Sequence, residues 1–240
     1  MIPTIKRSLL GASLLVSLAA VSNAATLLVD FNRGTSDTQS GFTAYQVPGS
    51  AAFQTTFAYA DTVSGNLTFT ATNGSGADNS RDRTSPANSG GFTYNALYRD
   101  FLFDNGNAGA DSFDITFSGL VASSAYSFTF YAFDHDQANG HTNTFTLNTA
   151  GATFNSIFIN TAGATGGTGV ITDAGTPTTN SQYALTLAGT TNSLGNISFT
   201  QTGSAYPILN GFEIVPEPSS AMALLSSIAL LLGIRRRRTA

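Results

Sequence analysis

Hydrophobic and polar residues alternate along much of the chain between residues 25 and 215. In the segment NLTFTAT at 66–72, Leu67, Phe69 and Ala71 are separated by threonines. A period of two is typical of a strand with one buried face, and no stretch of 25–215 has convincing helical periodicity. Strands are therefore predicted at 26–31, 66–72, 96–103, 112–120, 125–134, 143–148, 153–160, 182–189, 195–201 and 208–215.

Glycine, asparagine and aspartate separate several of these segments, as turns between strands require. The pattern predicts an all-β fold, a single antiparallel β-sandwich over residues 25–215 with a jelly-roll-like topology. Two polar stretches, 73–91 and 161–181, are expected to be long loops, although GVIT at 169–172 could form a small strand. The 18 phenylalanines are expected to supply much of the core.

The first 24 residues have the three parts of a secretory signal peptide. Lys6 and Arg7 form a positive start, and an apolar run follows at 9–21. Small residues then lead to Ala24, after which signal peptidase is expected to cut. The sequence therefore predicts export of the chain through the secretory translocon.

A second apolar segment, at 221–234, lies near the C-terminus and contains no charge. At 14 residues it would span about 21 Å as a helix, less than the roughly 30 Å of a hydrocarbon layer. The four arginines that follow can reach the headgroups and extend the span: Arg235, Arg236, Arg237 and Arg238. Clustered arginines stay on the cytoplasmic side, so we expect a short transmembrane helix with the rest of the chain outside.

The last residues combine three features in a fixed order: the motif Pro216, Glu217 and Pro218, the apolar segment, and the arginine cluster. This order, at 216–240, resembles the PEP-CTERM sorting signal of Gram-negative bacteria. The resemblance implies recognition by a membrane protease-transpeptidase called exosortase, cleavage near the Pro-Glu-Pro motif, and delivery to the cell envelope or an exopolysaccharide matrix. A plain tail anchor would keep the same topology without the processing step.

Two further segments carry a weaker resemblance at the edges of the body. LLVDFN at 27–32 and ILNGFEIV at 208–215 are similar to the first and last strands of galactose-binding-like jelly rolls, including malectin-like domains. The likeness supports a sandwich more than sugar binding, and no sugar-contacting residue of that family can be placed on this sequence.

The charge of the body differs from that of the whole chain. Residues 25–215 contain four arginines, no lysine and 13 acidic residues, a net charge of −9. Such a surface repels phosphate backbones, which argues against nucleic-acid binding, and suits divalent cations or neutral glycans better. The chain has no cysteine, and the absence of tryptophan removes the usual ring for stacking on sugars.

The segment FDHDQANGHTN at 133–143 gathers possible metal ligands. Asp134, Asp136 and Asn139 could supply oxygen ligands to Ca²⁺, although the spacing is not that of an EF-hand. A solvated acidic turn is the alternative. His135 and His141 would need a carboxylate partner to hold a transition metal.

Two other acidic stretches have simpler interpretations. DNGNAGAD at 104–111 is expected to be a turn, with a set of ligands as the alternative. The arginine of Tyr-Arg-Asp at 98–100 is expected to form a structural Arg–Asp pair, with a position near a groove as the alternative.

Enzyme signatures are missing from the sequence. There is no G-x-S-x-G motif or phosphate-binding glycine loop, and Glu213 is the only glutamate in the body. We therefore expect a non-catalytic, exported envelope or matrix protein associated with exopolysaccharide. One alternative is a lectin-like module, with or without the assistance of calcium, and another is a glycan-processing enzyme with distant paired carboxylates.

Overall fold

The computed structural model describes residues 25–34, 37–47, 53–73, 78–104, 112–134, 141–148, 153–159, 168–173, 176–203 and 206–218. All 15 regular elements within these ranges are strands, and none of the described residues is helical. The all-β expectation is therefore confirmed for the described part of the chain.

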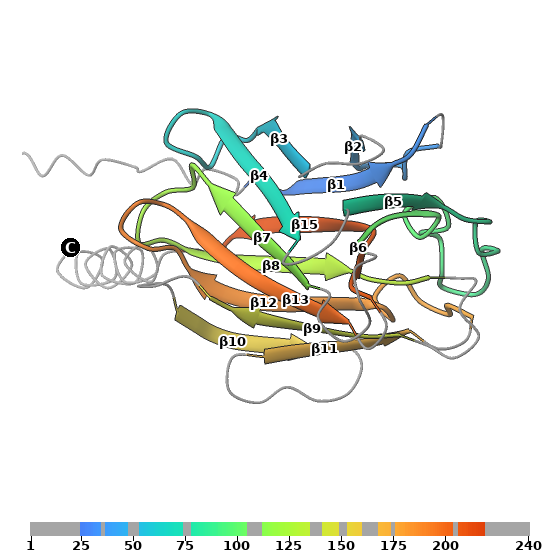
Figure 1. Cartoon of the computed structure of the whole chain (residues 1–240). Coiled ribbons are helices and arrows are strands. Elements are labelled where there is room, and N and C mark those ends of the chain that lie inside the picture. The colour runs from blue at the N-terminus through green and yellow to red at the C-terminus, as the bar shows by residue number, and fades with distance from the viewer. Residues whose placement is uncertain are drawn as a thin grey trace, which may run out of the picture.

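The strands form two six-stranded sheets and one smaller sheet (Figure 1). The first sheet has the order β10 (Thr153–Ile159), β12 (Ala184–Thr190), β8 (Ala125–Tyr131), β15 (Gly211–Pro216), β1 (Leu27–Asn32) and β2 (Thr43–Gln46). The second has the order β11 (Thr168–Asp173), β9 (His141–Leu147), β13 (Ile197–Gly203), β7 (Ser112–Ser118), β4 (Asn66–Asn73) and β3 (Phe53–Ala58). The third consists of β14 (Ile208–Leu209), β6 (Asp100–Asp104) and β5 (Asp78–Asp82).

Strand pairing within the sheets is antiparallel except between β1 and β2, which run parallel. From β7 to β13 each successive strand lies in the opposite six-stranded sheet, and β15 then returns to the first sheet. Because neighbours in sequence lie in different sheets, most pairings join strands that are far apart in the chain.

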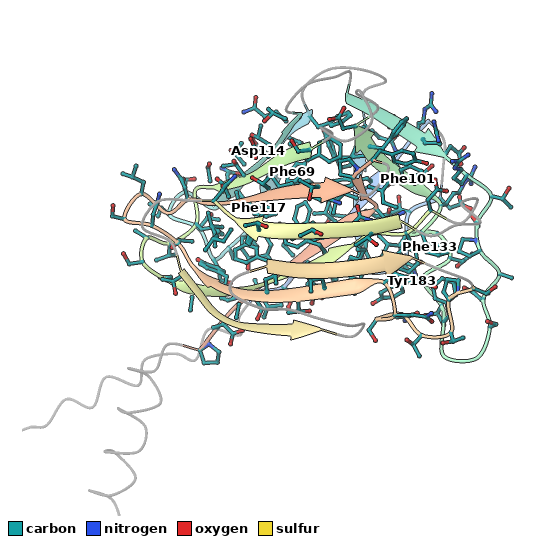
Figure 2. The ribbon with its side chains drawn as sticks, turned by 60° about the horizontal axis from the view of Figure 1, so that its bottom comes forward. Phe69, Phe101, Asp114, Phe117, Phe133 and Tyr183 are labelled. Carbon is teal, nitrogen blue, oxygen red and sulfur yellow. The ribbon has the colours of Figure 1, made fainter. Side chains whose placement is uncertain are left out.

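The two six-stranded sheets pack face to face through phenylalanine rings. Phe117 on β7 lies at the centre, with its ring centroid 5.0 Å from that of Phe212 on β15 and 5.3 Å from that of Phe128 on β8. Phe69 on β4 stacks on Phe212 at 5.1 Å. Figure 2 shows Phe69 and Phe117 between the sheets. The alternation in the sequence produces this core, because every second residue of these strands points inward.

A second apolar layer covers part of the outer face of the first sheet. Tyr98 stacks on Phe92 at 5.7 Å and approaches Tyr131, which points outward from β8, at 6.3 Å. The contact is close: a Cβ added at Gly211 would lie 2.8 Å from Leu97 Cδ1 and 2.3 Å from the carbonyl oxygen of Val29. Glycine in β15 therefore allows this segment to pack on the sheet.

The long loop expected at 73–91 is wrong in part, because residues 78–82 form β5 and pair with β6. The residues of β5 lack apolar alternation, because Arg81 takes the place where an apolar side chain would be expected. Its guanidinium lies 4.4 Å from the ring centroid of Phe103. In the stretch 161–181, residues 168–173 form β11, which contains the small strand considered at 169–172.

Other strand boundaries also differ from expectation. Residues 96–99 form a turn, with the Arg99 amide donating to the carbonyl of Ala96 at 3.1 Å, and β6 begins only at Asp100. The segment 208–215 is divided at Asn210 into β14 and β15. Strands β2 and β3 were not predicted, because they are an edge strand of each sheet and have polar, largely exposed alternate positions.

Candidate functional site

The Pro-Glu-Pro motif lies where the chain leaves the folded body. Strand β15 runs through Pro216, which is opposite Tyr126 on β8. The amide of Glu217 donates to the carbonyl of Ala125 at 2.9 Å, and the hydroxyl of Ser127 donates to the Glu217 carboxylate. The first two residues of the motif are therefore attached to the beginning of β8, and the boundary expected after Val215 falls inside a strand.

Exposure increases along the motif. Pro216 is half-buried, whereas Glu217 and Pro218 are exposed. Proline has no amide hydrogen, so pairing of the chain with β8 cannot continue through Pro218 by backbone donation. The motif thus begins in the sheet and ends in solvent.

The other residues of the expected export and sorting signals lie outside the described residues. These are Ala24, the apolar segment 221–234 and the arginines at 235–238. Within the part of the chain that is described, no helix has the length and hydrophobicity needed to cross a bilayer.

Asp134, the first of the expected calcium ligands, forms a buried ion pair. Its side chain is fully buried, and Arg83 donates to both carboxylate oxygens, from Nε at 3.0 Å and from Nη2 at 2.9 Å. The Tyr206 hydroxyl donates to Oδ2 at 3.1 Å. Burial, followed by the charge of Asp134, raises the pKa of Tyr206. A cation at Asp134 would have to displace these donors.

The remaining expected ligands cannot be placed around Asp134, because Asp136 and Asn139 lie outside the described residues, as does His135. His141 is the first residue of β9, opposite Asp173 of β11. Among the described residues, no group of three or more histidine, cysteine or acidic side chains is positioned to hold a metal ion. The calcium site stays a prediction.

An open, polar depression lies beside the third sheet. It is lined by Asp82, Arg83, Thr84, Ser85 and Arg99. Arg99 donates to the two carboxylate oxygens of Asp82 at 2.7 and 3.0 Å, an aspartate pair of the kind expected for this arginine. The hydrogen bond from Arg99 lowers the pKa of Asp82, and Arg33 contributes in the same direction.

All four arginines of the body therefore gather at one end of the molecule. Arg81 and Arg83, two positions apart, lie over Phe103 and Phe101 of β6, at 4.4 and 5.9 Å from the ring centroids. Sequence reasoning missed this grouping because 73–91 was interpreted as a loop. The i, i+2 spacing of Arg81 and Arg83 was the available signal, since it places both side chains on one face of a strand.

Two carboxylates are buried beneath this end of the molecule. Asp30 and Asp100 are each 1% exposed. The Gln39 amide donates to Asp30 Oδ2 at 2.7 Å. Burial is the main cause that raises the pKa of Asp30 to about 7; the hydrogen bond from Gln39 opposes this rise, and the nearby charge of Asp100 adds to it.

Asp104, the first residue of the second acidic stretch, is buried at the end of β6 and accepts a hydrogen bond from the Ser112 amide at 3.2 Å. The rest of that stretch, 105–111, lies outside the described residues. Glu213 lies on the outer face of β15 and accepts a hydrogen bond from the Tyr131 hydroxyl at 3.3 Å. Burial raises the pKa of Glu213.

Comparison with known proteins gave no match: no family model, curated protein or solved structure is significantly similar to this chain. The function therefore has to be argued from the residues themselves.

Proposed function

We propose that this chain is an exported, non-catalytic protein of the cell envelope or extracellular matrix, sorted by a C-terminal PEP-CTERM signal. A signal peptide directs it through the translocon, and the C-terminal apolar segment holds the precursor in the inner membrane of a Gram-negative bacterium. An exosortase-like enzyme then processes it near Pro216–Pro218. The body, a jelly-roll-like β-sandwich, becomes a structural or adhesive component associated with exopolysaccharide.

The observation that carries this proposal is the order of the tail: the Pro-Glu-Pro motif, the uncharged segment 221–234 and four arginines. The location of the motif supports it, since Glu217 and Pro218 are exposed at the point where the chain leaves the last strand. A processing enzyme acting on the extended chain after β15 would not need to open the core.

The lectin-like alternative ranks second because of Asp134. Calcium-assisted sugar binding through this residue would require its carboxylate to exchange Arg83 and Tyr206 for a cation. That exchange would place a cation beside the Arg83 guanidinium at a largely buried site, and repulsion between the two positive charges makes it costly. The glycan-processing alternative has no comparable observation in its favour.

Replacing Pro216, Glu217 and Pro218 together by alanine tests the proposal. In cells that process the parent chain, we expect the variant to be exported and to lose its signal peptide but to keep its C-terminal residues. Intact-mass analysis of the protein recovered from those cells measures both ends at once.

Ser127→Ala is the matched control, because it removes the side-chain hydrogen bond to Glu217 and leaves the motif unchanged. We expect it to be processed like the parent. Normal C-terminal processing of the triple variant would disprove the role of the motif, and an intact N-terminal signal peptide on the parent would disprove export.

A further inference from the structure

Three large hydrophobic side chains are exposed among the described residues, and each lies on a loop. Val63 is 79% exposed, Leu194 is 77% exposed and Val121 is 42% exposed. They belong to the β3–β4 loop at 59–65, the β12–β13 loop at 191–196 and the β7–β8 loop at 119–124. We call these three loops the apolar loop cluster.

Hydrogen bonds join the three loops into one surface. The Val63 amide donates to the carbonyl of Gly119 at 3.1 Å, and the Leu120 amide donates to the carbonyl of Gly195 at 3.1 Å. Gly195 has a φ of +73°, and a Cβ there would lie 2.1 Å from the carbonyl oxygen of Leu120. The loops are therefore held in a fixed arrangement that leaves the apolar side chains pointing into solvent.

The apolar loop cluster lies at the end of the molecule from which the tail departs. The hydroxyl of Tyr126, on β8 opposite Pro216, accepts from the Val121 amide at 3.0 Å and donates to the Asp61 carbonyl at 2.9 Å. In Figure 1 the three loops lie at the left, whereas β5 and β6 lie toward the right.

The apolar segment of the tail follows this end of the molecule closely in the sequence. Only residues 219 and 220 separate Pro218 from the apolar segment that begins at Ala221. The three steps along the chain from Pro218 to Ala221 cover at most about 11 Å when fully extended. The loops must therefore lie close to any bilayer that the segment enters. The four arginines of the body lie at the opposite end. Strand β1 begins at Leu27, which is paired with Ile214 near the end of β15, and runs away from it to Asn32, after which Arg33 follows.

We infer that the apolar loop cluster contacts the outer leaflet of the membrane that holds the tail, with Val63, Val121 and Leu194 inserted among the headgroups. The inference rests on the proposed function for the presence of the bilayer. Asp61 is the only charged residue in the three loops, which otherwise contain small, polar and apolar residues. The contact is therefore apolar rather than electrostatic, and high salt should not release it.

The absence of tryptophan allows a direct test. Val63→Trp, Val121→Trp and Leu194→Trp each introduce a single tryptophan, which can be excited selectively over the eight tyrosines of the chain. Each variant, as residues 25–240 with the tail kept, is reconstituted in phosphatidylcholine vesicles. We expect blue-shifted emission from each, and quenching of about two-fold or more when the lipids carry brominated acyl chains. Neither should change between low and high salt. Thr84→Trp, exposed at the arginine end, is the matched control and should emit as in water, unquenched.

The outcomes separate this inference from the proposed function. If the chain does not float with vesicles, membrane anchoring by the tail fails and this inference fails with it. If the chain floats but the three loop probes emit as in water, only this inference is wrong. Blue-shifted emission without quenching by brominated lipids would show that protein, either a second copy or another partner, covers the loops, and would also overturn it. Thermal melting of each variant checks that the fold is kept.

Discussion

At the residue scale, Asp30 carries a carboxyl group in a location that water hardly reaches. It alternates in β1 with Val29 and Phe31, which face the core, so it lies on the outer face of the first sheet. The segment that contains Leu97 covers that face, and the Gln39 side chain accepts a hydrogen bond from the backbone amide of Leu97 at 3.5 Å. Burial therefore follows from packing by a distant segment and not from the position of Asp30 within its own strand.

Replacing Asp30 by asparagine should change how stability depends on pH. The pKa of Asp30 rises from 3.8 to about 7 on folding, so the folded state favours the protonated form. This group therefore stabilises the parent most below pH 4, and that contribution declines from about pH 4 to about pH 7. Asp30→Asn should be more stable than the parent at pH 8, by up to about 4 kcal/mol, and nearly equal to it at pH 4.

Urea unfolding of both proteins at several pH values measures this difference. Asp114→Asn, on an exposed position of β7, controls for the loss of one negative charge from the molecule as a whole. An equal loss of stability at pH 4 and pH 8 in Asp30→Asn would instead indicate that the carboxyl matters for its shape and hydrogen bond alone.

Asp134 shows what the sequence can and cannot give at this scale. The residues around it made it a reasonable cation ligand, because alternate oxygen-bearing side chains follow a strand. Its partner Arg83 is 51 positions away, in a segment without apolar alternation. Single-sequence patterns report the neighbours of a residue along the chain, and the partner here is set by the pairing of β5 with β6.

At the scale of elements, two ion pairs of the same kind join residues in or next to the strands of the third sheet to other segments. Arg83–Asp134 and Arg99–Asp82 are both formed by Nε and Nη2 on the two carboxylate oxygens. They differ in burial: the Asp134 side chain is 0% exposed and that of Asp82 is 38% exposed. The two pairs therefore form an internal comparison of the same chemistry in different surroundings.

Arg83→Met should cost about 3 kcal/mol, because it removes the guanidinium that donates two hydrogen bonds to the buried Asp134 carboxylate. Arg99→Met should cost less than about 1 kcal/mol, since water replaces the guanidinium at an exposed aspartate. Urea unfolding at pH 7 measures both, and the double variant Arg83→Met/Asp134→Asn should recover part of the loss. Equal costs for the two arginines would contradict the importance of burial.

Strand prediction succeeded where every inward position of a strand is apolar and failed where polar residues occupy some of these positions, as Thr55 does between Phe53 and Phe57 of β3. The segments that became β4, β7 and β8 alternate strictly because their inner residues fill the space between the sheets. Arg81 in β5 and Arg83 just after it lie on aromatic rings instead, so this strand shows no apolar alternation in the sequence. The all-β class could therefore be predicted, whereas the third sheet could not.

At the scale of the whole molecule, the two ends are chemically unlike. The end where β15 finishes has exposed valine and leucine and no basic residue in its loops, and the other end has four arginines. The sequence shows only the i, i+2 spacing of Arg81 and Arg83, because the other members of each grouping come from segments that the sheet order brings together. The order of residues at 216–240 predicts the orientation of the tail, and the fold shows at which end of the body the described chain reaches Pro218.

The phenylalanine core is shared by the two six-stranded sheets. Phe117 touches rings from both sheets, including those of Phe69, Phe128 and Phe212. Phe117→Ala should lower the free energy of unfolding by about 3–5 kcal/mol through lost contacts and the remaining cavity. Val63→Ala, at a side chain that is 79% exposed, should change it by less than about 0.5 kcal/mol.

Thermal and chemical unfolding followed by circular dichroism compares these two variants with the parent. A single transition that shifts as a whole in Phe117→Ala is expected, because both sheets share that ring. Separate transitions for the two sheets would mean that they unfold independently.

The position of β15 between β8 and β1 also constrains the order of events during synthesis. Strands β1 and β2 join the rest of their sheet only through β15, the last strand of the body. In a chain that is translocated from its N-terminus, β1 therefore cannot pair with its sheet until residues 211–216 have emerged. Until then it has to stay unfolded or bound to a chaperone. If the chain is exported as proposed, the apolar segment at 221–234 reaches the translocon by that stage, and its capture in the bilayer would precede completion of the fold.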